Sequence, residues 1–138
     1  MKNLFLFLLS LLFIVNSYSQ TYFKATQTEM YTHNKTTGDW DLYQKNSDVE
    51  IIVVVEDEFL SIQGNSPSMY KIYLNTKEAI NTKGLSGFRY QGRDLKTDEK
   101  VTIDIIRSKE SESAGGMISI IYVQPNYNLR FFVIPYKN

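Results

Sequence analysis

The sequence predicts an all-β protein, a single antiparallel meander that forms either a barrel or a sandwich of about 8–9 short strands. Runs rich in Tyr, Phe, Ile, Val and Thr recur between turn residues that are spaced roughly 8 to 15 residues apart. Parallel strands would need crossover segments of about a dozen or more residues, usually helical, and these are missing. We therefore expect successive strands to pair as hairpins.

The first 19 residues have the layout of a secretory signal peptide. Lys2 precedes an apolar run over residues 4–15, and Ser17 and Ser19 supply small residues before a cut at Gln20. The run is shorter than the roughly 20 residues that span a bilayer as a helix. We therefore expect an exported protein, periplasmic or extracellular, with no stable membrane span after cleavage. Residues 20–138 then form one all-β domain.

Nine strands are expected along this domain. Residues 50–55 and 59–63 form the clearest early pair, and residues 88–91 are expected to pair with 101–106. Val101, Ile103 and Ile105 alternate with Thr102 and Asp104, the period-two pattern of a half-buried strand. A helical turn is expected at residues 77–80. The nine expected strands cover residues 22–31, 40–44, 50–55, 59–63, 69–74, 88–91, 101–106, 117–123 and 129–134.

Composition excludes several functions. The 15 acidic and 15 basic residues balance, and no basic run suggests a nucleic-acid partner. Without cysteine there is no disulfide, thiol nucleophile or zinc–thiolate site, so an apolar core must hold the domain together. We expect no cofactor and no bound metal.

The charged turns are expected to be solvated. Glu56, Asp57 and Glu58 fill the short connection of a hairpin, whereas a calcium site would need six or more oxygens. Asp94 is interpreted in the same way, as part of a turn facing water. His33 has no second histidine or cysteine with which to bind zinc, and no G-x-S-x-G motif accompanies it.

The aromatic residues are the candidate binding residues. Trp40, the single tryptophan, either plugs the core or lines a cavity in which its ring would stack on a ligand. The many tyrosines are either ordinary sheet residues or part of a binding surface. Phe131 and Phe132 point to opposite faces of their strand, so either both faces are covered or one ring is exposed. The candidate ligand-binding residues are Trp40, Tyr43, Tyr70, Tyr73 and Tyr122.

Gly38-Asp39-Trp40 resembles the G-x-W motif of lipocalins, exported barrels that hold small apolar ligands. The resemblance implies that Trp40 seals the barrel floor. The chain departs from the family pattern in four respects: a strand precedes the motif, no T-D-Y motif is present, no C-terminal helix is expected after the last strand, and Arg130 lies inside that strand.

The sequence thus predicts an exported, non-enzymatic binding or interaction module of the cell envelope. Its partner would be either a small apolar ligand held in a barrel cavity or another envelope protein bound on an aromatic face. The third alternative is a small carboxylate-dependent hydrolase, since carboxylate pairs are assembled in space and not along the chain.

Overall fold

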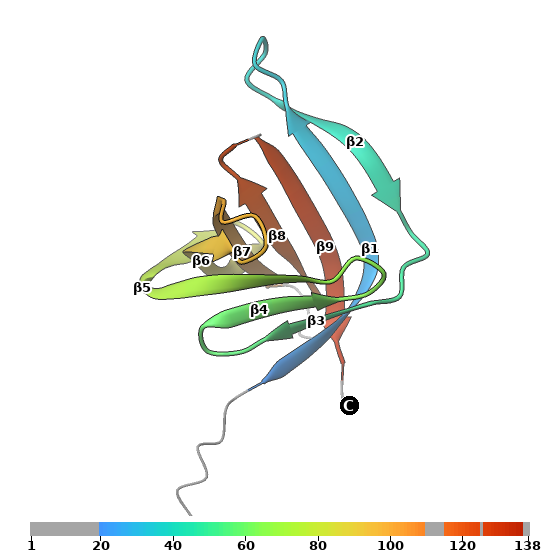
Figure 1. The fold of residues 1–138 in the computed structure, drawn as a ribbon, viewed down its shortest axis with the longest axis vertical. Coiled ribbons are helices and arrows are strands. Elements are labelled where there is room, and N and C mark those ends of the chain that lie inside the picture. The colour runs from blue at the N-terminus through green and yellow to red at the C-terminus, as the bar shows by residue number, and fades with distance from the viewer. Residues whose placement is uncertain (1–19, 110–114, 125, 137–138) are drawn as a thin grey trace, which may run out of the picture.

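A computed structural model describes residues 20–109, 115–124 and 126–136 of the chain. The predicted signal peptide lies outside the described residues. Nine antiparallel strands and no helix make up the described part, which confirms the predicted fold class (Figure 1). The strands are β1 (Thr21–His33), β2 (Trp40–Asn46), β3 (Ile51–Val55), β4 (Phe59–Gln63), β5 (Ser68–Thr82), β6 (Leu85–Asp94), β7 (Lys100–Ser108), β8 (Gly116–Tyr122) and β9 (Tyr127–Pro135).

The sheet closes into a barrel of eight strands, so the choice between barrel and sandwich is settled. From β3 to β9 each strand pairs with the next along the chain, and β1 pairs with both β3 and β9. The predicted hairpin over residues 50–63 is confirmed, with Val55 opposite Leu60. The predicted pairing of 88–91 with 101–106 is also confirmed, with Phe88 opposite Ile105. No helix among the described residues is long and apolar enough to cross a membrane.

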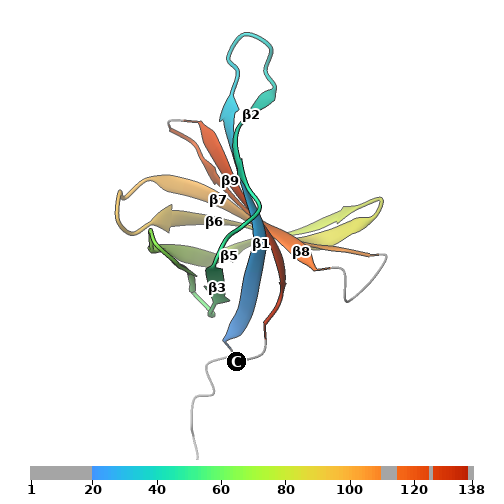
Figure 2. The ribbon, with the colours of Figure 1, turned by 90° about the vertical axis from the view of Figure 1, so that its right-hand side faces the viewer.

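β2 is the one described strand that does not belong to the eight-stranded barrel. It pairs with the second half of β1, on the edge that β3 occupies along the first half. The pairing of β9 with β1 ends at Thr32, so the tip of the β1–β2 hairpin projects beyond the barrel (Figures 1 and 2). Trp40 begins β2 opposite His33 at this tip. The expectation that Trp40 plugs the core or seals the barrel floor is therefore wrong.

The core inside the barrel consists mainly of aliphatic side chains. Val101 and Ile103 are buried on the inward face of β7, as the alternation predicts, and Ile105 follows them on the same face. Phe131 also points inward and is buried, whereas Phe132 lies on the outer face and is half-buried. Burying such a side chain stabilises the fold by about 1.5–3 kcal/mol, so the chain holds together without disulfides.

At Gly92 the backbones of β5 and β6 leave no space for a side chain. A Cβ atom at this position would lie 2.4 Å from the carbonyl oxygen of Lys71 on the neighbouring strand. Only glycine permits so close an approach, and such glycines occur where a barrel turns a corner. As a result, β6 contributes no side chain to the barrel interior at Gly92.

The helical turn expected at residues 77–80 is not formed, because β5 continues through this segment. Its pairing with β6 jumps from Tyr73 opposite Gln91 to Glu78 opposite Arg89, so residues 74–77 bulge out of the ladder. The hydroxyl of Thr76 accepts a hydrogen bond from the backbone N–H of Gln91 at 2.8 Å. The polar composition of the segment therefore reflects an exposed bulge, and an isolated helical turn this short would not be stable.

Candidate functional site

One end of the barrel interior, here called the Tyr122 end, holds a cluster of hydrogen-bonded polar side chains. Tyr70 from β5, Tyr122 from β8 and Asp94 from β6 all lie on the inward face and are buried. The two phenol oxygens are 2.7 Å apart, and the Tyr122 hydroxyl donates to Asp94 Oδ2 at 2.6 Å. Tyr127 stacks on the Tyr122 ring with centroids 4.3 Å apart. These contacts leave little freedom for any of the three polar groups.

The turn after β6 completes the environment of Asp94. Its second carboxylate oxygen, Oδ1, accepts hydrogen bonds from the backbone N–H groups of Lys96 at 2.8 Å and Thr97 at 3.2 Å. Asp94 is 5% exposed, so the expectation that it faces water is wrong. By accepting hydrogen bonds from the backbone of the turn, the Asp94 side chain stabilises the turn from inside the barrel, which is a common role of aspartate in turns.

Burial and hydrogen bonding set the protonation states at this end. Burial alone favours the neutral acid at Asp94, but the hydrogen bonds from Tyr122, Lys96 and Thr97 outweigh it and lower the pKa of Asp94. Burial, together with the hydrogen bond to this carboxylate, raises the pKa of Tyr122, and burial raises the pKa of Tyr70. At neutral pH the cluster therefore holds one carboxylate and two neutral phenols. The polar groups of the cluster are thus satisfied by one another and by the turn after β6, which favours a structural role for them.

The other end of the barrel, here called the Gly116 end, contains a pocket of about 590 Å³. Its walls come from the first residues of β1 and β8, the last residues of β7 and β9, and the β5–β6 hairpin, which extends away from the barrel body (Figure 2). Small-molecule pockets typically measure about 300–1,000 Å³ and are lined mainly by apolar side chains. The apolar lining includes Phe23, Ala79, Phe88, Ile105, Ile118 and Val133.

A second hollow, of about 720 Å³, lies beside the Tyr122 end between β1, β2 and the segment joining β4 to β5. Most of its lining residues are polar, and it carries charges of both signs from Glu29, Asp48, Glu50 and Arg130. An apolar ligand would leave these groups without water, which is costly. The smaller pocket at the Gly116 end is therefore the better candidate for an apolar ligand.

The structure separates the five candidate residues predicted from the sequence. It brings Tyr70 and Tyr122 together in the cluster at the Tyr122 end, and neither lines the apolar pocket at the Gly116 end, whereas Tyr70 lines the hollow of about 720 Å³. Trp40 is half-buried on the hairpin, where its ring meets the edge of His33 with centroids 5.2 Å apart. Tyr43 is 71% exposed on β2, and Tyr73 is half-buried on β5. None of the five lines the pocket at the Gly116 end.

The acidic triplet forms the predicted tight turn between β3 and β4. Asp57 and Glu58 are exposed, and Glu58 lies 3.8 Å from the ammonium group of half-buried Lys71. Glu56 is half-buried and accepts a hydrogen bond from the side chain of Gln20. Within the described ranges, no three His, Asp or Glu side chains gather in a way that could hold a metal ion.

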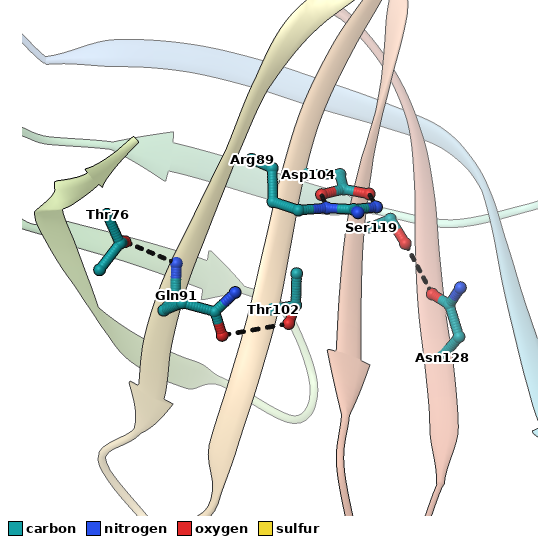
Figure 3. Close-up of polar contacts among 7 residues, drawn as sticks. All are labelled: Thr76, Arg89, Gln91, Thr102, Asp104, Ser119 and Asn128. Carbon is teal, nitrogen blue, oxygen red and sulfur yellow. Dashed lines mark hydrogen bonds and ion pairs between the residues drawn. The ribbon is translucent and has the colours of Figure 1, made fainter. Parts of the chain in front are cut away.

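The outer face of strands β6 to β9 carries paired polar groups (Figure 3). The Arg89 guanidinium donates to both carboxylate oxygens of buried Asp104 at 2.7 Å, and the Ser119 hydroxyl donates to Asn128 Oδ1 at 2.7 Å. Thr102 donates to the side-chain oxygen of Gln91 across the same strands at 3.3 Å. Bidentate and buried pairs of this kind fix strand register, so we assign them a structural role.

No protein-family model, curated protein or solved structure matches this chain. Function is therefore inferred from the sequence and from the geometry of the barrel.

Proposed function

We propose that this protein is an exported, non-enzymatic binding protein that holds a small apolar ligand in the pocket at the Gly116 end of the barrel. The pocket of about 590 Å³ is the observation that carries the proposal. It suits a ligand better than the rest of the barrel interior, which is filled by core side chains such as Leu60, Ile103 and Ile120. The signal-peptide pattern of residues 1–19 supports export.

Lipocalins also hold small apolar ligands inside a barrel, and residues 38–40 resemble their G-x-W motif. The closed antiparallel barrel is compatible with that resemblance. Trp40 gives it no support, because it stands on the β1–β2 hairpin and not at the barrel floor. The proposal therefore depends on the pocket and not on membership of that family.

Binding of an uncharged, environment-sensitive naphthylamine dye to the purified protein tests the proposal. We expect saturable binding with one dye per protein and an emission shifted to the blue. Ala79→Trp would fill the pocket from β5, and we expect it to weaken binding by about tenfold or more. Thr82→Trp is the matched control, because Thr82 is exposed on the same hairpin and does not line the pocket.

Circular dichroism and thermal melts of both variants establish that each is folded. A protein that binds no dye, or a folded Ala79→Trp variant that binds it as well as the Thr82→Trp control, would contradict the proposal.

A further inference from the structure

The Gly116 end of the barrel has two inward rows of residues in register across β5 to β8. The deeper row is apolar and runs through Ala79, Phe88, Ile105 and Ile118. The next row toward the rim is polar and runs through Asn81, Ser86, Arg107 and Gly116. All eight residues line the pocket. The pocket thus has an apolar floor and a polar rim with one charged residue.

Arg107 continues the inward alternation of β7. It follows Val101, Ile103 and Ile105 at intervals of two, so it belongs to the face that forms the core and not to the outer face. A charged side chain without a partner is almost never fully buried, so one on an inward face indicates that the face reaches water there. Arg107 is exposed, at the point where the interior opens.

Gly116 lies opposite Arg107, where the backbones of β7 and β8 leave no space for a side chain. It is the register partner of Arg107 on β8, and a Cβ atom there would lie 2.3 Å from the carbonyl oxygen of Ile106. Close approach of the backbones therefore demands glycine at this position. As a result, β8 contributes no side chain to the rim beside the guanidinium group.

The charge of Arg107 is not neutralised by a neighbour within the described residues. Arg89 pairs with Asp104 and Arg93 with Asp98, and Arg130 lies over the Tyr31 ring at 4.2 Å. Among the residues that the structure describes, Arg107 has no such partner, and none of the residues lining the pocket is acidic. The guanidinium group of an arginine can bind a carboxylate or a phosphate with two parallel hydrogen bonds.

We infer that the ligand is a single-chain amphiphile with a carboxylate head, its chain on the apolar row and its head at Arg107. This inference rests on the proposed function and adds the chemical class of the ligand. The positive charge of Arg107 at the rim complements the negative charge of the head. Because the apolar row lies deeper than the polar row, the hydrocarbon chain points into the barrel and the head lies at the rim.

Decanoate and decanol separate the head-group contact from binding of the chain, because each is a single chain of ten carbons and only decanoate is charged at neutral pH. We measure the affinity of each by displacement of the uncharged dye. The wild-type protein should bind decanoate about tenfold more tightly than decanol at low salt, the scale of one charge-assisted contact. Arg107→Gln should remove this preference. Lys100→Gln is the matched control, since Lys100 is an exposed cation on the same strand outside the pocket, and it should keep the preference.

Equal binding of decanoate and decanol by the wild-type protein would overturn the inference while leaving the proposed function in place. A preference for decanoate that survives Arg107→Gln would also overturn it, because another cation would then hold the head. If neither compound displaces the dye and the dye itself does not bind, the proposed function fails together with the inference.

Discussion

The Tyr122 hydroxyl donates a hydrogen bond of 2.6 Å to Asp94 across the inside of the barrel, joining β8 to the turn after β6. These residues are distant in sequence, and the strands that carry them are separated by β7. The bond therefore ties two non-adjacent strands through the interior, in addition to the backbone ladders. Its contribution to stability is open to direct measurement.

Tyr122→Phe should lower the free energy of unfolding by roughly 2–3 kcal/mol, because a buried carboxylate then loses a donor. Tyr70→Phe should cost less, about 1 kcal/mol, since Asp94 keeps its bond from Tyr122. Tyr136→Phe, at an exposed position, should change stability by no more than about 0.5 kcal/mol. Urea unfolding measures all three. Equal losses for Tyr122→Phe and Tyr70→Phe would show that the carboxylate does not depend on its phenol donor.

Alkaline pH should destabilise the barrel. Burial raises the pKa of Tyr70, Tyr90, Tyr122 and Tyr127 above the ordinary value of 10.0. Because the folded pKa exceeds the unfolded one, this stabilisation is complete below pH 10 and is lost as the pH rises beyond it.

Phenolate absorbance of the native protein should therefore rise later with pH than that of the protein in urea, and the urea midpoint should fall from about pH 10 upward. Coincident native and unfolded titration curves would contradict the burial of these rings.

The strands could be predicted from the sequence because period-two alternation and turn residues are local signals. Val101 to Ile105 show the alternation, and the register of β7 with β6 follows it. The prediction of a helical turn at residues 77–80 was wrong, because polar composition alone does not distinguish an exposed bulge from a short helix. The bulge depends on a partner strand that the segment itself does not specify.

The site residues were harder to predict, because they meet only after the barrel closes. The position of Asp94 inside the barrel depends on the register of β5, β6 and β8 together, and a turn acid is usually solvated. One signal in the sequence did point to the rim: the alternation of Val101, Ile103 and Ile105 continues to Arg107. An arginine that continues the alternation of core residues along a strand indicates that this face of the strand reaches water at that position.

Gly92→Ala should be strongly destabilising, by roughly 3 kcal/mol or more, because its Cβ atom would lie 2.4 Å from a backbone carbonyl oxygen that cannot move alone. Gly64→Ala is the matched control. There the nearest atom is the Ile51 side chain at 3.2 Å, which can adjust, so the cost should be about 1 kcal/mol or less. Urea unfolding compares the two. Similar losses of stability at both positions would show that the backbones of β5 and β6 can separate at Gly92 more easily than the structure indicates.

Trp40→Ala should lower the free energy of unfolding by only about 1 kcal/mol, the scale of a single edge-to-face aromatic contact. A core tryptophan would cost roughly 3–5 kcal/mol, the value expected if Trp40 plugged the barrel. The difference arises because Trp40 lies beyond the last pairing of β9 with β1, where His33 is its aromatic partner. Ile103→Ala, at a fully buried position, provides the reference and should cost about 2–5 kcal/mol.

A double-mutant cycle of Trp40→Ala with His33→Ala isolates the contact between the two rings, and the coupling should be about 0.5–1.5 kcal/mol. Because the hairpin tip projects from the barrel, acrylamide should also quench the fluorescence of Trp40 in the native protein. A cost equal to that of Ile103→Ala, together with native fluorescence shielded from the quencher, would instead place the indole inside the barrel.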